Sequence, residues 1–140
     1  RAEFGPRALG NRSLLADPRG HEIKDRVNEI KHRQKFRPFA PAILEEYKDE
    51  YFEGPMNEYM QFVAKAKHDY SSVTHVDGTA RVQVVKKDCK SIIRPILEEW
   101  YDRTGCPMLL NTSLNIKGKP IVNDWNDASE FERQYRVAVF

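Results

Sequence analysis

The chain has 140 residues, a length that fits one domain with a real buried core. Its 23 Lys and Arg residues are balanced by 21 Asp and Glu residues, and the net charge is +2. This balance argues against a nucleic-acid-binding protein, which normally carries a clear basic excess, and the sequence contains no apolar run long enough to span a membrane.

Cysteine and histidine usage points to a protein without a structural metal. Cys89 and Cys106 are too few and too far apart for a zinc knuckle or a disulfide framework, so we expect reduced thiols in a cytoplasmic protein. The histidines are too scattered to form a ligand set, and no protein-held metal is expected. They are His21, His32, His68 and His75.

Helices and strands are predicted to alternate without a regular βαβ repeat, which favours an α+β fold with a mixed α/β sheet. In the first half of the chain the pattern predicts a loop over 1–12, a strand over 13–16, an amphipathic helix over 19–35, a strand over 42–44 and a short helix or turn over 45–52. In the second half it predicts a strand over 59–63, a polar loop over 65–72, a strand over 79–85, a helix from 91 that Gly105 ends, strands over 108–111 and 120–122, a helix over 124–133 and a last strand over 137–140.

The first loop carries two close turns, each with a guanidinium group. Glycine allows backbone N–H groups to approach an anion, and Pro6 fixes the direction in which Arg7 leaves the turn. Arg12 follows the second turn at Gly10. Arg7 and Arg12 are therefore candidate anion ligands, although an ordinary surface loop with solvated arginines would look the same.

A second group of cations follows the first predicted helix. Lys31, Arg33, Lys35 and Arg37 stand close together with no acidic residue among them, and Pro38 stiffens the exit. Like charges at this spacing cost free energy unless an anion neutralises them. The alternative is a helix C-terminus, whose dipole attracts cations.

Two further segments carry polar groups beside predicted strands. His75 and Asp77 precede Arg81, and they could orient its guanidinium or hold Mg²⁺ through water, although Asp77-Gly78 is also a hairpin signal. The run 111–113 ends a buried strand, a common place for ligands, but it could equally form a self-bonded turn. Its three residues are Asn111, Thr112 and Ser113. No Walker loop, dinucleotide fingerprint or serine nucleophile elbow occurs.

Together these segments resemble the C-terminal domain of the O-carbamoyltransferases, a group that includes antibiotic-tailoring and nodulation-factor enzymes. The resemblance spans residues 2–128. Its motifs are AEFGPRALGNRS at 2–13, KHRQKFRPFAP at 31–41, HVDGTARVQ at 75–83 and GCPMLLNTSLN at 105–115. Leu114 stands where the family pattern has Phe, a change expected to affect packing only.

The resemblance implies a YrdC-like fold for a single domain over residues 1–140. It implies that this domain is a fragment of a longer two-domain enzyme whose N-terminal transferase domain is absent here. In such enzymes the C-terminal domain binds ATP with Mg²⁺ and carbamoyl phosphate and forms carbamoyl-adenylate. The N-terminal domain then passes the carbamoyl group to a substrate hydroxyl.

Site roles follow by motif position. Catalytic roles are expected for Lys31, Arg37 and Arg81. Contacts with ATP or carbamoyl phosphate are expected for Arg7, Arg12, Arg33, His75, Asp77, Asn111, Thr112 and Ser113.

Two other classes of function remain open from the sequence. One is a YrdC-like module that binds double-stranded RNA or another anion without catalysis, and its affinity should fall steeply with salt. The other is a structural domain that packs on a missing partner, and it should present a large exposed apolar face.

Overall fold

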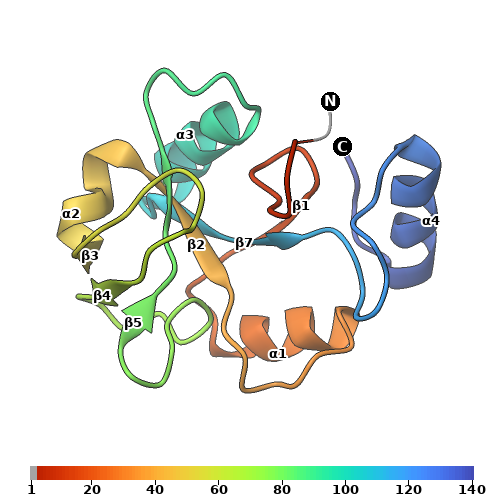
Figure 1. The fold of residues 1–140 in the computed structure, drawn as a ribbon, viewed down its shortest axis with the longest axis horizontal. Helices are drawn as coiled ribbons and strands as arrows, with labels where there is room; N and C mark the ends of the chain where they lie inside the picture. Colours follow the sequence, from red (N-terminus) through yellow and green to blue (C-terminus); the bar gives the residue numbers. More distant parts are fainter. Residues whose placement is uncertain (1–2) are drawn as a thin grey trace.

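The computed structural model describes residues 3–140, so Ala2 of the first motif lies outside the described residues. A four-stranded sheet occupies its centre (Figure 1), with the spatial order β1-β7-β2-β6. The strands are β1 (Ser13–Ala16), β2 (Ala40–Leu44), β6 (Gln83–Val85) and β7 (Met108–Ser113). β7 is antiparallel to β1 and β2, while β2 and β6 are parallel. The predicted mixed α/β sheet is therefore confirmed.

A small antiparallel sheet lies at the left of Figure 1. Its strands, in spatial order, are β3 (Phe52–Glu53), β4 (Ala64–Ala66) and β5 (Thr79–Ala80). Phe52 and Ala80 are buried in one cluster with Ile43 and Met108 of the main sheet. This apolar contact joins the two sheets into one body.

Helices cover both faces of the main sheet. They are α1 (His21–Ile30), α2 (Lys48–Tyr51, after a 3-10 turn at Glu45–Tyr47), α3 (Ile93–Thr104) and α4 (Trp125–Tyr135). Leu110 packs with residues of α1 and α4, whereas its neighbour Leu109 packs against α3. Successive residues of a strand point to opposite faces, so this alternation assigns α1 and α4 to one face and α3 to the other.

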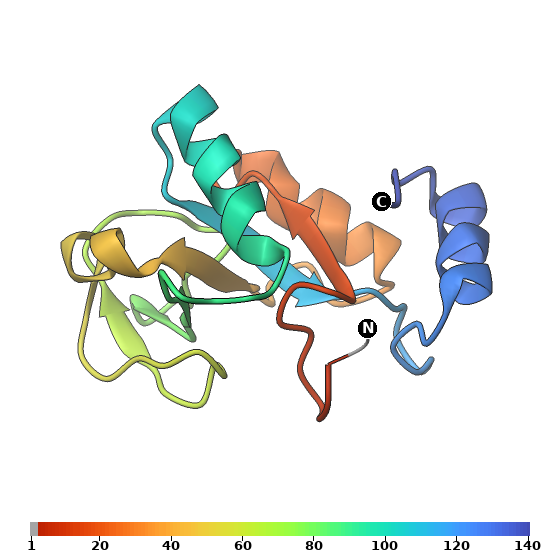
Figure 2. The same ribbon diagram turned by 90° about the horizontal axis from the view of Figure 1, so that it is seen from above.

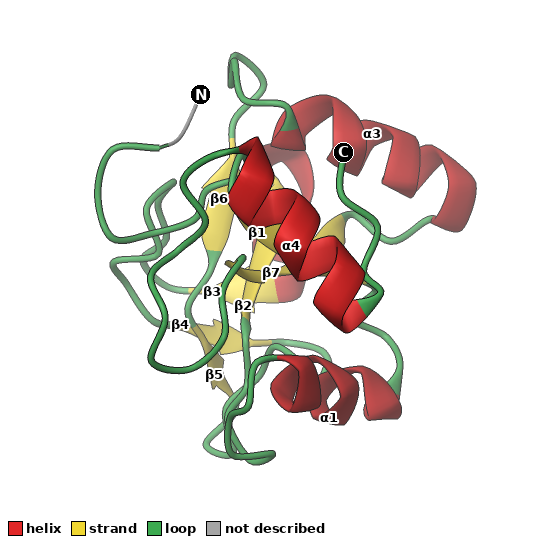
Figure 3. Ribbon diagram, turned by 90° about the vertical axis from the view of Figure 1, so that its right-hand side faces the viewer, coloured by secondary structure: helices red, strands yellow, loops and turns green. Residues whose placement is uncertain are grey.

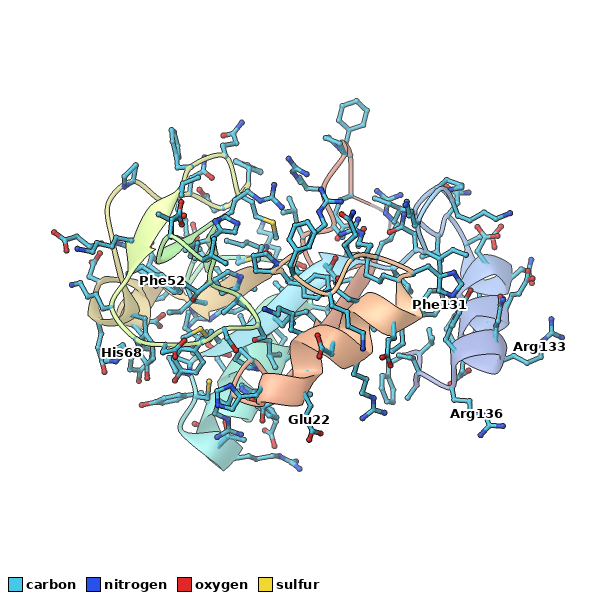
Figure 4. All side chains as sticks on the ribbon, turned by 90° about the horizontal axis from the view of Figure 1, so that it is seen from below. Glu22, Phe52, His68, Phe131, Arg133 and Arg136 are labelled. Atoms are coloured by element: carbon cyan, nitrogen blue, oxygen red, sulfur yellow. The ribbon has the colours of Figure 1, made fainter. Side chains whose placement is uncertain are left out.

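The figures show the same layers. Figure 1 shows α3 above and α1 below the main sheet, Figure 2 shows α4 (blue) at one end of the molecule, and Figure 3 looks onto that end with α4 in front. In Figure 4, Phe131 of α4 points toward α1, while Arg133 points away from the protein. Phe131 is buried with Val27 of α1, as an amphipathic helix requires.

Helix ends follow the sequence signals closely. α3 ends at Gly105, whose φ of +68° is left-handed and whose N–H donates to the carbonyl of Tyr101 at 2.7 Å. α4 begins after Asp124, whose side chain accepts hydrogen bonds from the backbone N–H groups of Asn126 and Asp127. Within residues 3–140, no helix is both long and apolar enough to cross a membrane.

Several predicted elements are wrong. The predicted strands over 59–63, 120–122 and 137–140 are irregular, and a strand forms over Ala64–Ala66 instead, after Met60 turns the chain with a φ of +56°. The predicted strand over 79–85 is divided between the two sheets, because the chain leaves one sheet and enters the other around Arg81.

The first helix is also shorter than predicted. α1 ends at Ile30 because Lys31 closes it and His32 adopts a left-handed φ of +52°. A left-handed conformation is uncommon outside glycine, and it cannot continue a right-handed helix.

Candidate anion-binding site

Strand direction brings the cationic motifs to one end of the main sheet. β1 and β2 both run antiparallel to β7, and β6 is parallel to β2, so β1, β2 and β6 point the same way. The residues just before these three strands therefore lie at the same end as the last residues of β7. Arg7, Arg37 and Arg81 precede β1, β2 and β6, and Ser113 ends β7.

Five cations come together at this end, and we call them the cation cluster. They are Arg7, Lys31, Arg33, Arg37 and Arg81. Burial lowers the pKa of Arg81, and repulsion from Arg7 and Arg33 lowers it further. Burial and then Arg37 lower the pKa of Arg33. The predicted convergence of the motifs is therefore present in the fold.

No carboxylate neutralises this cluster within residues 3–140. Every ion pair described between those residues involves other cations, such as Arg12, Arg19 or Arg94. Unpaired cations held close together cost free energy and attract anions. Such an arrangement is suited to binding an anion.

Lys31 is the most deeply buried cation, with no exposed side-chain surface. Its Nζ donates to the backbone carbonyls of Ser113 and Asn115, the latter at 2.8 Å, and to Oδ1 of Asn115 at 3.0 Å. All these acceptors are neutral. Burial, with a smaller contribution from Arg33, lowers the pKa of Lys31 from 10.5 to about 7.

The segment after α1 is held by a buried amide that the sequence analysis missed. Asn28 is fully buried, and its Nδ2 donates to the carbonyls of Arg37 at 3.0 Å and Lys35 at 3.3 Å. The backbone carbonyl of Asn28 accepts a hydrogen bond from the N–H of Arg33 at 2.8 Å. Asn28 therefore fixes the backbone on which Arg33 and Arg37 stand.

Lys35 does not belong to the cluster. Its Nζ lies 2.9 Å from Oε1 of Glu29, the penultimate residue of α1. The expectation that this whole segment lacks an acidic partner is therefore wrong for Lys35, because the helix brings Glu29 back beside it.

Arg12 supports the first loop through an acid within the same motif. Its Nε lies 3.1 Å from Oε2 of Glu3, whose Oε1 accepts from the N–H groups of Leu9 at 2.9 Å and Asn11 at 2.6 Å. Glu3 thus organises the loop that carries Arg7. A ligand contact by Arg12 stays a prediction, and it would compete with this ion pair.

His75 and Asp77 form a local turn around Thr79. Oδ1 of Asp77 accepts from the N–H of Thr79 at 3.0 Å and from its hydroxyl at 2.6 Å, while Nδ1 of His75 lies 3.0 Å from that hydroxyl. The hydrogen bonds from Thr79 hold the pKa of Asp77 below its usual range. These contacts shape the turn that leads to Arg81, and a direct role in ligand or Mg²⁺ binding stays a prediction.

At the end of β7 the polar side chains face different surroundings. Asn111 is 2% exposed, and its Nδ2 donates to Oε1 of Gln83 at 2.6 Å and to the carbonyl of Ala8 at 3.1 Å. Ser113 lies beside Lys31, with its hydroxyl 2.6 Å from Oδ1 of Asn115, and Thr112 is half-buried. Sequence reasoning placed Gln83 beside Arg81 on a strand but gave it no role.

A separate groove of about 1040 Å³ runs along β1, the outer strand of the main sheet. Ile92, Ile96 and Trp125 line it, and all three side chains are exposed. Among the described residues, 3–140, no group of three or more His, Cys, Asp or Glu side chains could hold a metal ion.

Comparison with known proteins assigns the family. The protein family described as "Carbamoyltransferase C-terminus" matches residues 1–140, and the chain belongs to that family. It is 47% identical to nodulation protein NolNO of Sinorhizobium fredii over 137 residues. The matched region covers 91% of this chain and 20% of that protein.

Two other relatives show the same coverage. Nodulation protein U of Rhizobium tropici is 38% identical over 138 residues, which are 95% of this chain and 24% of the relative. An uncharacterized protein of Methanocaldococcus jannaschii is 43% identical over 131 residues, which are 90% of this chain and 25% of that relative. The chain thus spans about a fifth to a quarter of the length of these relatives.

Proposed function

We propose that this chain binds ATP and carbamoyl phosphate at the cation cluster and forms carbamoyl-adenylate, the first half of an O-carbamoyl transfer reaction. The observation that carries the proposal is the convergence of Arg7, Lys31, Arg33, Arg37 and Arg81 at one end of the sheet, without a carboxylate partner in residues 3–140. Membership of the carbamoyltransferase C-terminus family supports carbamoyl as the transferred group.

The proposed chemistry explains why several fixed cations are needed. Carbamoyl phosphate loses inorganic phosphate to water, and an oxygen of the resulting carbamate attacks the α-phosphorus of ATP. The bond between the α-phosphorus and its bridging oxygen breaks, and pyrophosphate leaves. Both partners are anions that repel each other, and fixed cations offset that repulsion and stabilise the charge of the transition state.

The cations are suited to different parts of this task. Guanidinium groups contact phosphate and carbamoyl oxygens through two parallel hydrogen bonds, so Arg37 and Arg81 are assigned to the transferring groups. Lys31 contributes a charge beside Ser113 at the end of β7. Asn115 keeps that ammonium in place.

Magnesium enters this proposal only with the nucleotide. The carboxylate of Asp77 is engaged with Thr79, and the described residues hold no cluster of carboxylates for a protein-bound divalent ion. The proposal therefore assigns Mg²⁺ to the nucleotide, and none of the steps assigned to the described residues depends on a protein-bound ion.

Transfer of the carbamoyl group to a hydroxyl is assigned to the part of the relatives' length that this chain does not span. We expect the 140-residue chain alone to leave added alcohols unmodified. Any carbamoyl-adenylate that it releases should be destroyed by water, because such an intermediate needs an enclosed path.

Calorimetry and a pyrophosphate assay test the proposal together. We expect heat of binding with millimolar ATP–Mg²⁺ and with millimolar carbamoyl phosphate, and slow pyrophosphate release when both are present. No heat with either ligand would contradict the binding step. Heat without pyrophosphate would leave an anion-binding module and remove the adenylate step, and carbamoylation of an alcohol by this chain alone would contradict the division of labour.

A further inference from the structure

Two buried amides join three of the four motifs. Asn111 lies on β7, and Gln83 begins β6, two residues after Arg81; β2 lies between the two strands. Nδ2 of Asn111 donates to Oε1 of Gln83 at 2.6 Å and to the carbonyl of Ala8 at 3.1 Å, while Nε2 of Gln83 donates to the carbonyl of Leu9 at 3.2 Å. The pair therefore holds the backbone carbonyls of Ala8 and Leu9, directly after Arg7.

Burial excludes both amides from direct work on a ligand. Asn111 and Gln83 are 2% and 4% exposed. Oδ1 of Asn111 is buried and has no hydrogen-bond partner within residues 3–140, so this side chain is oriented entirely by the bonds of its Nδ2. A buried side-chain amide keeps such an orientation only when its donors are well used.

The charges around the pair give it a task. Arg7 is exposed on its loop, and its repulsion contributes to the lowered pKa of Arg81. Without a restraint, like charges move apart. A carboxylate could hold them together, but it would also neutralise the site, whereas a neutral amide pair holds the backbone and leaves both positive charges available.

We propose that Asn111 and Gln83 are positioning residues that hold the Arg7 loop beside Arg81 before an anion binds. This inference rests on the proposed anion site. It replaces the predicted ligand contact of Asn111 by an indirect role, in which its hydrogen bonds set the spacing of two guanidinium groups.

Removal of the pair should loosen one loop and weaken anion binding. In Asn111→Leu the carbonyl of Ala8 and Oε1 of Gln83 lose their donor, and repulsion from Arg81 then favours open positions of Arg7. We expect affinity for inorganic pyrophosphate to fall roughly tenfold, since a well-formed hydrogen bond of this kind contributes about that much. Gln83→Met should act in the same direction with a smaller change of shape.

The test combines hydrogen exchange with a thermodynamic cycle. Backbone exchange is measured for wild type, Asn111→Leu, Gln83→Met and the matched control Asn28→Leu, which removes a buried amide that holds residues 35–37 instead. Pyrophosphate affinity is then measured for wild type, Asn111→Leu, Asn28→Leu and Arg7→Gln, and for Arg7→Gln combined with each amide variant.

We expect faster exchange over residues 8–12 in Asn111→Leu and Gln83→Met, and faster exchange near residues 33–37 only in Asn28→Leu. The affinity loss of Asn111→Leu should largely vanish when Arg7 is already Gln, while the loss in Asn28→Leu should add to it. Unchanged exchange at 8–12 in both variants, or full additivity of Asn111→Leu with Arg7→Gln, would overturn the inference. If wild type binds no pyrophosphate, the proposed anion site fails, and the exchange result alone decides whether the pair holds the loop.

Discussion

Lys31 and Arg94 are both buried cations near helix ends, but their surroundings are opposite. Arg94, in the first turn of α3, donates to Glu46 at 2.6 and 3.0 Å, to Glu98 at 2.7 Å and to the carbonyl of Val85 at 3.1 Å. Lys31, directly after α1, donates only to neutral oxygens of Ser113 and Asn115.

The two pKa values move in opposite directions for this reason. The hydrogen bonds that Arg94 donates to Glu46, and then to Glu98, raise its pKa against the effect of burial. Burial lowers the pKa of Lys31 to about 7. A buried cation paired with carboxylates holds the fold together, whereas an ammonium kept among neutral groups has no fixed counter-ion, and an incoming anion can supply one.

We expect the largest effect on stability from removal of Arg94, the cation that is paired with carboxylates. Arg94→Met should lower the free energy of unfolding by about 3 kcal/mol, because it removes the donor shared by Glu46, Glu98 and the carbonyl of Val85. Within residues 3–140, Glu46 then keeps only the ion pair with Lys87 at 3.9 Å. Urea unfolding measures the change. Arg103→Met, which breaks an exposed pair with Glu99, is the control and should cost no more than about 0.5 kcal/mol. An equal loss in both variants would contradict the structural role of Arg94.

At the cation cluster we expect geometry to matter as well as charge. Arg81→Lys keeps the charge but removes the two-pronged hydrogen bonding, so pyrophosphate release should slow at least about a hundredfold, or roughly 2.7 kcal/mol. Arg133→Lys, at an exposed position of α4 that points away from the protein (Figure 4), should leave the rate unchanged. A near-wild-type rate in Arg81→Lys would show that Arg81 is only structural.

Lys31→Met should weaken anion binding more than it changes stability, the opposite of what we expect for Arg94→Met. Removal of the buried charge relieves desolvation but leaves the acceptors of Ser113 and Asn115 unpaired, so the stability change should stay within about 1 kcal/mol. Affinity for pyrophosphate should fall roughly tenfold through loss of a nearby charge. Strong destabilisation with unchanged affinity would reverse the comparison.

Stability should also depend on pH through Lys31. Because the folded-state pKa of Lys31 is about 7 and its ordinary value is 10.5, the unfolded chain binds more protons between these values. The contribution of Lys31 to stability is therefore present above pH 10.5 and is lost as the pH falls toward 7. Wild type should gain stability relative to Lys31→Met as pH rises through this window, as measured by urea unfolding.

Binding should show the complementary trend. A bound anion favours the charged form of Lys31, so pyrophosphate binding near pH 8 should take up protons, and affinity should decline at higher pH. Calorimetry in buffers of different ionisation enthalpy measures this uptake. Its persistence in Lys31→Met would assign it to another group.

The sequence predicted those features that depend on residue type and local punctuation. Gly105 ends α3 as expected, and the cations of the first three motifs were recognised from their residue type and their neighbours in the sequence. Spatial partners were harder to predict. Glu29 returns to Lys35 through the helix, and a predicted strand at 59–63 gave way to a turn at Met60.

The buried amides were not predictable in this way. Asn28 sits within an ordinary helical pattern, and Gln83 within an ordinary strand pattern, so neither has a local signal. Their roles come from partners that only the folded chain supplies, such as the carbonyl of Ala8, which is 103 positions from Asn111 in the sequence. Long-range pairing, not propensity, decides which polar side chains become part of the site.

The position of β7 also dictates when the site can exist during synthesis. β7 is the last strand of the main sheet in sequence but lies between β1 and β2 in space. A nascent chain that has not reached Met108 therefore has neither the strand that joins β1 to β2 nor the acceptors of Lys31, which are 82 and 84 positions away. Contacts of such long range form late in folding, so the mutually repelling cations are gathered only after nearly the whole domain has been made.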